Sequence, residues 1–183
     1  MSAESNKVEL GSKIIDFNLL NPILNKKQSL NELKSPNGNV IIFMCNHCPY
    51  VIHILPKLVE FSNEFIAKGI NFIGINSNDI SSYPEDSPEK MIEYANKYGI
   101  PFPYLFDESQ EIAKKYFAAC TPDIYVFNQN DALYYHGRFD AARPGLDTPV
   151  TGNELREALD YMLSGKVYDK PQYPSIGCSI KWK

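Results

Sequence analysis

The stretch Phe43–Tyr50, with the sequence FMCNHCPY, constrains this chain more than any other feature because it places two thiols between a strand and a helix. The apolar run Val40–Met44 predicts a buried strand. The residues that follow, Tyr50–Lys68, predict a helix whose apolar side chains recur at helical spacing. Since the N-terminus of a helix carries a partial positive charge, a cysteine at this junction is placed to form a thiolate.

The composition restricts the classes of protein open to the chain. Its 183 residues predict a single domain, 1–183, and its net charge of −4 provides no basic surface for nucleic acid. No apolar run approaches the ~20 residues of a membrane span, and the polar start Met1–Lys7 lacks the apolar stretch of a secretory signal. We therefore expect a cytoplasmic protein, in which close cysteine pairs are more often catalytic or metal-binding than structural.

Strand and helix patterns alternate along the chain and predict an α/β fold with a mixed central sheet flanked by helices. Strands are expected over residues 14–20, 40–45, 71–76, 103–106, 123–128 and 132–138. Helices are expected over residues 29–33, 50–68 and 87–98, and two more further along the chain. Capping signals begin these last two helices, Asp107 with Gln110 and Thr151 with Glu154.

The C-terminal tail, residues 168–183, is rich in proline and aromatic residues and is predicted to be extended. Ile176, Ile180 and Trp182 alternate as in a half-buried strand, so we expect the tail to dock on the domain with Trp182 partly buried. Cys178 lies within this tail, and we expect a structural role that leaves it beyond disulfide reach of Cys48.

Several stretches together resemble the thioredoxin-fold redoxin family, and most closely its peroxiredoxin-like branch related to alkyl hydroperoxide reductase and the thiol-specific antioxidant proteins. They are residues 43–51 (FMCNHCPYV), 102–110 (FPYLFDESQ), 120–127 (CTPDIYVF), 139–144 (FDAARP) and 174–183 (PSIGCSIKWK). The resemblance implies a thioredoxin-like fold with an N-terminal strand extension. It also implies a cis-proline that faces the active cysteine, and Thr121-Pro122 fits that place. There the backbone would be open to pairing with a substrate.

Two registers compete for the attacking cysteine. In one, Cys45 opens a C-x-x-C motif that resembles protein disulfide isomerase; in the other, Cys48 opens a C-P-Y-V motif that resembles glutaredoxin with its second cysteine replaced. Pro49 favours the second register because proline belongs at the first helical position, which makes Cys48 the cap. The thiol of Cys48 would then face free N–H groups, with Cys45 near enough to be the partner thiol.

Three other residues remain open to two interpretations. His47 either lowers the pKa of a neighbouring thiol or is simply solvated. Cys120 and Cys178 are candidates to resolve a disulfide, although packing is the favoured role of each.

The chain departs from the peroxiredoxin pattern at the groups that activate a peroxide. Counting back from Cys48, Cys45 stands where the motif has a hydroxyl residue and Ile41 stands where it has proline. The arginine that assists in peroxiredoxins would fall near Thr121-Pro122, where there is none. The usual means of polarising the O–O bond is therefore missing from its usual positions.

Three functions follow, in order of preference. The first is a thiol–disulfide oxidoreductase without a cofactor, in which Cys48 attacks a thiol/disulfide substrate and Cys45 resolves the mixed disulfide. A reducing partner such as thioredoxin or glutathione would restore the thiols. The second is a thiol peroxidase with antioxidant activity, acting through a sulfenic acid on Cys48. The third is a copper- or zinc-binding module that uses Cys45, His47, Cys48 and Cys120.

Overall fold

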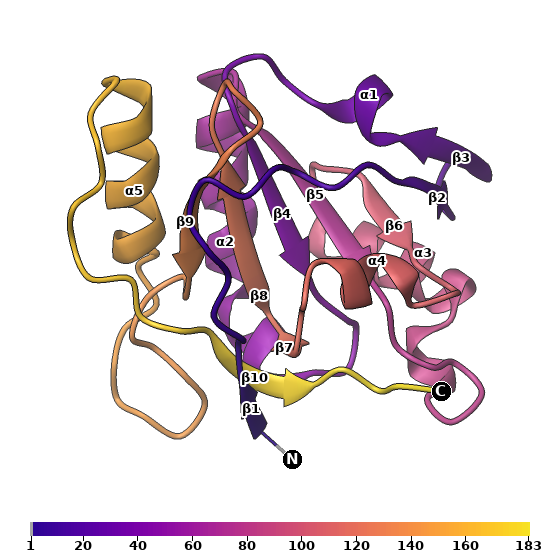
Figure 1. Cartoon of the computed structure of the whole chain (residues 1–183). Helices are drawn as coiled ribbons and strands as arrows, with labels where there is room; N and C mark the ends of the chain where they lie inside the picture. Colours follow the sequence, from indigo (N-terminus) through magenta and orange to yellow (C-terminus); the bar gives the residue numbers. More distant parts are fainter. Residues whose placement is uncertain (1) are drawn as a thin grey trace.

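The computed structural model describes residues 2–183 and shows a seven-stranded mixed sheet with helices on both faces (Figure 1). In chain order the elements are β1 (Ser2–Glu4), β2 (Asn18–Asn21), β3 (Lys26–Ser29), α1 (Leu30–Leu33), β4 (Asn39–Phe43), α2 (Pro49–Ala67), β5 (Asn71–Asn76), the 3-10 turn η1 (Pro84–Asp86), α3 (Pro88–Tyr98), β6 (Tyr104–Phe106), α4 (Glu111–Lys115), β7 (Cys120–Thr121), β8 (Asp123–Phe127), β9 (Leu133–Gly137), α5 (Asn153–Leu163) and β10 (Ile176–Ser179).

The central strand β4 organises the main sheet, whose order is β3-β2-β6-β5-β4-β8-β9. It pairs in parallel with β5 and antiparallel with β8, with Phe43 opposite Ile75 on one side and Asp123 on the other. All five residues of β4 are buried, which explains why the strand reads as a continuous apolar run rather than an alternating one.

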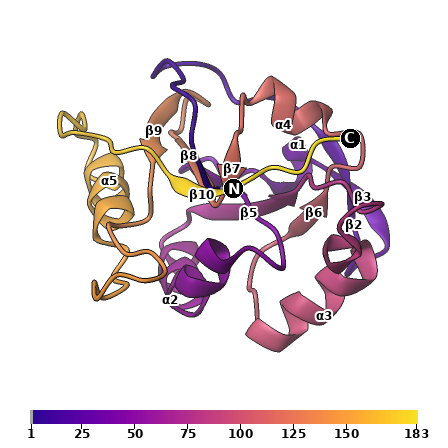
Figure 2. The ribbon, with the colours of Figure 1, turned by 90° about the horizontal axis from the view of Figure 1, so that it is seen from below.

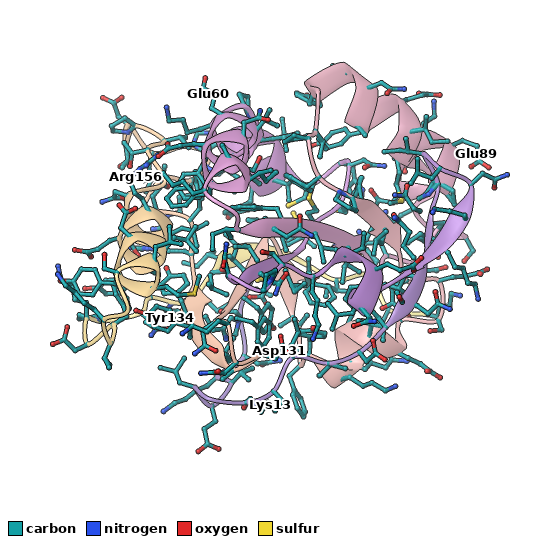
Figure 3. The ribbon with its side chains drawn as sticks, turned by 90° about the horizontal axis from the view of Figure 1, so that it is seen from above. Lys13, Glu60, Glu89, Asp131, Tyr134 and Arg156 are labelled. Atoms are coloured by element: carbon teal, nitrogen blue, oxygen red, sulfur yellow. The ribbon has the colours of Figure 1, made fainter. Side chains whose placement is uncertain are left out.

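The alternating side chains of β4 divide the interior into two cores. Val40 and Ile42 pack with α2, α3 and α5, whereas Ile41 and Phe43 pack on the opposite face with α1 and α4 (Figure 2). Charged side chains such as those of Lys13, Glu60 and Glu89 are exposed and project outward around this frame (Figure 3). Within residues 2–183, no helix is long and apolar enough to cross a membrane.

The chain ends form a second, three-stranded sheet in the order β1-β10-β7. Its strand β10 comes from the tail that the sequence predicts to be extended, and Ile180 just beyond it is only 3% exposed. Trp182 keeps 43% of its surface exposed and is the weaker anchor of the two. The sequence missed β1 and the polar strand β3, because backbone pairing with distant residues or with β2 defines them rather than apolar patterning.

Two predicted helix caps are wrong. Helix α4 begins after Gln110, because Asp107 still continues the sheet and donates its backbone N–H to Asn76. The Asp107 carboxylate reaches α4 from further back and accepts hydrogen bonds from the Ala113 N–H at 3.0 Å and the Ser77 hydroxyl at 2.9 Å.

Helix α5 is capped by Gly152, whose φ of 68° suits glycine, instead of by a capping box. The carboxylate of Glu154 does not turn back to the cap because Arg138 binds it through several N–O contacts of 2.8–3.0 Å.

Asp107 should therefore contribute to stability although it is not the cap. We expect Asp107→Ala to lower the free energy of unfolding by about 2–3 kcal/mol, because a buried carboxylate that accepts three hydrogen bonds is lost. Urea denaturation followed by circular dichroism measures this change. Glu108→Ala, at an exposed side chain next to it, is the control, and equal losses for the two variants would contradict the assignment.

Candidate active site

Cys48 occupies the N-cap of α2, with Pro49 at the first helical position. The chain reaches this point from β4 because Met44 donates its N–H to Ile75 at 2.9 Å, which extends the sheet before the loop begins. The side chains of Cys45 and Cys48 are 1% and 0% exposed. Both candidate thiols thus lie at the carboxyl end of the central strand, inside the protein.

Thr121 contacts both thiols from the opposite side. The peptide bond between Thr121 and Pro122 is cis, as predicted. The Cys48 thiol donates to the Thr121 carbonyl at 3.0 Å, and the Sγ of Cys45 lies 3.5 Å from the Thr121 hydroxyl oxygen. Because β8 follows directly and pairs with β4, the main sheet holds this peptide against the thiol pair.

The two cysteines have opposite pKa shifts. Donation from the Cys45 thiol lowers the pKa of Cys48 to about 5, helped by the Thr121 hydroxyl, the Cys178 thiol and the Val51 N–H, and opposed by burial. The Thr121 carbonyl also opposes this shift, because it can accept a hydrogen bond only from the protonated Cys48 thiol. The several donors to the thiolate outweigh this single contact. The pKa of Cys45 is raised, first by this sharing with Cys48 and then by burial. At neutral pH the pair therefore favours one thiolate, on Cys48, and one thiol, on Cys45.

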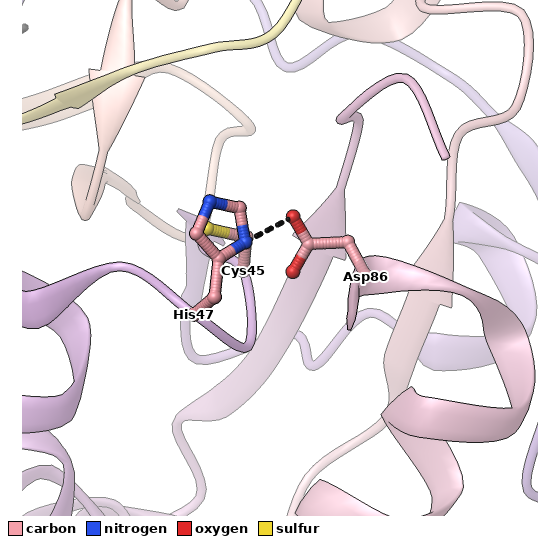
Figure 4. Close-up of side chains that lie close together, drawn as sticks. All are labelled: Cys45, His47 and Asp86. Atoms are coloured by element: carbon pink, nitrogen blue, oxygen red, sulfur yellow. Dashed lines mark ion pairs between the residues drawn. The ribbon is translucent and has the colours of Figure 1, made fainter. Parts of the chain in front are cut away.

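His47 turns toward a buried carboxylate that the sequence did not single out. Its Nδ1 lies 2.8 Å from Asp86 Oδ2 (Figure 4). Its ring also stacks on Tyr83 at 5.6 Å between centroids. The contact with Asp86 is an ion pair when His47 is protonated, and it is out of line for a hydrogen bond. His47 is thus held in one orientation instead of being freely solvated.

Asp86 also fixes the loop between the two thiols. Its Oδ1 accepts the Asn46 N–H at 2.8 Å, and its Oδ2 accepts from the Asn78 side chain at 2.7 Å. The Tyr104 hydroxyl donates to the Asn46 side chain at 3.0 Å. The only sequence signal for Asp86 is its place before the Ser87-Pro88 helix start, which says nothing of a contact 40 residues away.

The predicted metal site can be compared with the positions of its ligand atoms. Ligand atoms of Cys45, His47 and Asp86 lie within 4.8 Å of one another, whereas the predicted ligands Cys48 and Cys120 are not part of this group. Asp86 already accepts two protein hydrogen bonds, and the raised pKa of Cys45 opposes the deprotonation that a metal ligand needs. The trio therefore suits orientation of His47 better than metal binding.

The two remaining cysteines, Cys120 and Cys178, differ in their environments. Cys120 is fully buried, burial raises its pKa, and its thiol points to the carbonyls of Pro122 at 3.6 Å and Ser175 at 3.8 Å, which fits packing. Cys178 is partly exposed, and burial followed by the nearby Cys48 thiol raises its pKa to about 11. The expected structural role of Cys178 stays a prediction, and pairing of β10 with β7 places Cys178 opposite Thr121, whose carbonyl contacts Cys48.

A cavity of about 420 Å³ adjoins the site on the far side of Pro122. Tyr50 of α2 and Ile176 of β10 contribute to its wall, together with the loop that follows β9. The thiols themselves do not line it, so the cavity is an extension of the site rather than its reacting centre.

A buried thiol pair that joins a central strand to a capped helix, opposite a cis-proline, defines a thioredoxin-fold thiol protein, as predicted. Solved structures agree: a thioredoxin-family thiol:disulfide interchange protein from Chlorobium tepidum shares the fold at a TM-score of 0.63, with 15% identity over 86% of this chain and 99% of that one. The chain belongs to the AhpC/TSA family, whose model matches residues 10–136. The redoxin prediction is confirmed at this level, and the peroxiredoxin-like branch stays a prediction.

Two much more similar solved structures cover almost the whole chain. An uncharacterized conserved protein from Geobacillus kaustophilus is 49% identical over 100% of this chain and 97% of that one, with a TM-score of 0.98. A hypothetical protein from Sinorhizobium meliloti 1021 is 41% identical over 98% of both chains, with a TM-score of 0.95. No curated protein sequence matches the chain at a significant level.

The opposite pKa shifts of Cys45 and Cys48 predict that Cys48 titrates below the ordinary thiol range. We expect the thiolate absorbance of Cys48 to appear with a midpoint near pH 5 and to move toward the ordinary thiol value of ~8.5 in Cys45→Ala, because the largest stabilising contact is removed. The midpoint is measured from the pH dependence of iodoacetamide labelling, with the label located at Cys48 by mass spectrometry. Cys120→Ala is the control, and an unchanged midpoint in Cys45→Ala would contradict the shared proton.

Proposed function

We propose that the chain is a thiol–disulfide oxidoreductase in which Cys48 is the nucleophile and Cys45 the resolving thiol. The observation that carries this proposal is the position of two buried thiols at the start of α2 against the cis Thr121-Pro122 peptide. The opposite pKa shifts agree with it, because they place the thiolate on Cys48 and the proton on Cys45. The Cys48 thiolate attacks one sulfur of a substrate disulfide, one substrate thiolate leaves, and a mixed disulfide forms. Cys45 then attacks Cys48 Sγ and expels the second substrate thiolate, which leaves a Cys45–Cys48 disulfide.

The second step requires Cys45 to lose its proton. Once Cys48 is in a mixed disulfide, its thiolate no longer takes a hydrogen bond from Cys45, so the main cause of the raised Cys45 pKa disappears. His47, within 4.8 Å of Cys45, is the nearby base, and its Nδ1 faces the Asp86 carboxylate. In this proposal Asp86 is a positioning residue: its carboxylate, 2.8 Å from Nδ1, holds the imidazole near Cys45.

The proposed setting is the reducing cytoplasm, where a thiol partner such as thioredoxin or glutathione would return two electrons to the Cys45–Cys48 disulfide. The substrate is then a protein or small-molecule disulfide. The likeness in fold to the thiol:disulfide interchange protein of Chlorobium tepidum supports this class of reaction.

A second candidate is a thiol peroxidase, and the AhpC/TSA family match favours it. The Thr121 hydroxyl, 3.5 Å from Cys45 Sγ, supplies from another strand a hydroxyl that the peroxiredoxin position lacks. Arg138 is bound to Glu154 and is not free to assist. Stopped-flow reaction with hydrogen peroxide decides between the two: a Cys48 no faster than free cysteine at equal thiolate fraction excludes the peroxidase.

Substitution of the thiols tests the leading proposal. Cys48→Ser should lower the rate of insulin disulfide reduction to background, a loss of at least ~100-fold, because the nucleophile is gone. Cys120→Ala should retain nearly the full rate since that thiol lies outside the reacting pair. Peptide mapping of the oxidised wild-type protein should recover Cys45 and Cys48 in one disulfide. Full activity in Cys48→Ser would reject the assignment.

A further inference from the structure

The tail strand β10 occupies the free edge of β7, directly before Pro122. It pairs antiparallel with β7, with Cys178 opposite Thr121 and Ser179 opposite Cys120. In Figure 1 it runs across the end of the main sheet beneath β7. An open strand edge is where an extended peptide adds by backbone pairing, so the tail takes the place that such a peptide would use.

The contact between the tail and Thr121 is at backbone distance. A Cβ built on Gly177 would lie 1.9 Å from the Thr121 carbonyl oxygen and 3.1 Å from the Pro122 nitrogen. Only glycine therefore allows the strand to lie this close. On its other edge β10 pairs with β1, where Ser2 stands opposite Cys178, so the tail is held from both sides.

This contact brings a third thiol to the reacting pair. The Thr121 carbonyl that faces Cys178 across the strand pair is the one 3.0 Å from Cys48 Sγ. Cys48 has no exposed surface, whereas Cys178 is partly exposed. Through β10, Cys178 thus lies opposite the same residue whose carbonyl contacts Cys48.

We propose that β10 is a built-in substrate segment: it fills the edge at which an extended disulfide-bearing peptide pairs, and it presents Cys178 to Cys48 as that peptide presents its cysteine. The inference rests on the proposed function and adds the substrate class, an extended polypeptide disulfide that displaces the tail. Cys178 is then a third redox-active thiol.

The exchange balances with an external disulfide RS–SR as the oxidant. After the tail lifts, the Cys48 thiolate attacks one sulfur, the S–S bond breaks, and RS⁻ leaves and is protonated by solvent. The tail redocks and Cys178, instead of Cys45, expels the second RS⁻ from Cys48 Sγ, so that the Cys178 proton goes to this RS⁻ and a Cys48–Cys178 disulfide forms. Cys45 then attacks Cys48 Sγ, its proton passes to the released Cys178 sulfur, and a Cys45–Cys48 disulfide remains.

The first test removes Cys45 so that the tail disulfide accumulates. Cys45→Ser treated with oxidised glutathione should yield a Cys48–Cys178 disulfide on non-reducing peptide mapping. Cys45→Ser/Cys178→Ser should instead retain a glutathione adduct on Cys48. A persistent adduct on Cys48 with Cys178 free in the single variant would overturn the proposal. Cys48 that is never modified in any of these proteins, wild type included, would reject the proposed function and this inference with it.

The second test moves the tail without touching a thiol. Gly177→Ala places a methyl group on the Thr121 carbonyl, so we expect iodoacetamide labelling of Cys48 and insulin reduction to rise about tenfold or more as the thiol is uncovered. Gly165→Ala is the control for a destabilising change away from the tail contact: its φ of 67° strains an alanine, while its methyl meets no atom within 4 Å. Equal rates in Gly177→Ala and wild type, or equal increases in both variants, would overturn the built-in substrate while leaving the activity of Cys48 intact.

Discussion

The contact between Thr121 and the two thiols is the interaction on which the rest of the site depends. The carbonyl of Thr121 lies 3.0 Å from Cys48 Sγ and its hydroxyl 3.5 Å from Cys45 Sγ. For this to happen, β8 must pair with β4 in one register, and α2 must begin at Pro49. A one-residue slip would turn Thr121 away from both sulfurs, so the sheet register and the chemistry are a single constraint.

Burial makes the sharing of charge between Cys45 and Cys48 effective. Two buried thiolates in contact would repel strongly, so ionisation of one sulfur holds the proton on the other. The donors around Cys48 decide which sulfur ionises, and the proximity of Asp86 further disfavours a charge on Cys45. The asymmetry therefore comes from the surroundings of two chemically identical groups, and formation of a mixed disulfide removes it.

Local rules in the sequence located the thiol junction, and long-range contacts explain what they missed. Pro49 at the first helical position identified Cys48 as the cap, because that preference acts within one turn. The role of Asp86 depends on a 2.8 Å contact with Asn46 across 40 residues, which no local pattern encodes. Asp107 was wrongly predicted as the cap of α4 for a related reason. Its backbone N–H binds Asn76 and continues the sheet, so only its carboxylate reaches α4, at the Ala113 N–H.

Docking of the tail explains how the reactive Cys48 thiolate is protected from over-oxidation. A thiol with a pKa near 5 is ionised at neutral pH and open to over-oxidation when exposed, but Cys48 is 0% exposed and β10 pairs with the residue whose carbonyl contacts it. An entering extended peptide would form the same kind of backbone hydrogen bonds with β7 that β10 gives up, so these bonds largely cancel. Discrimination between substrates must then come from side chains, and the cavity beside Pro122, with Tyr50 in its wall, is the surface next to the reacting sulfur that can supply it.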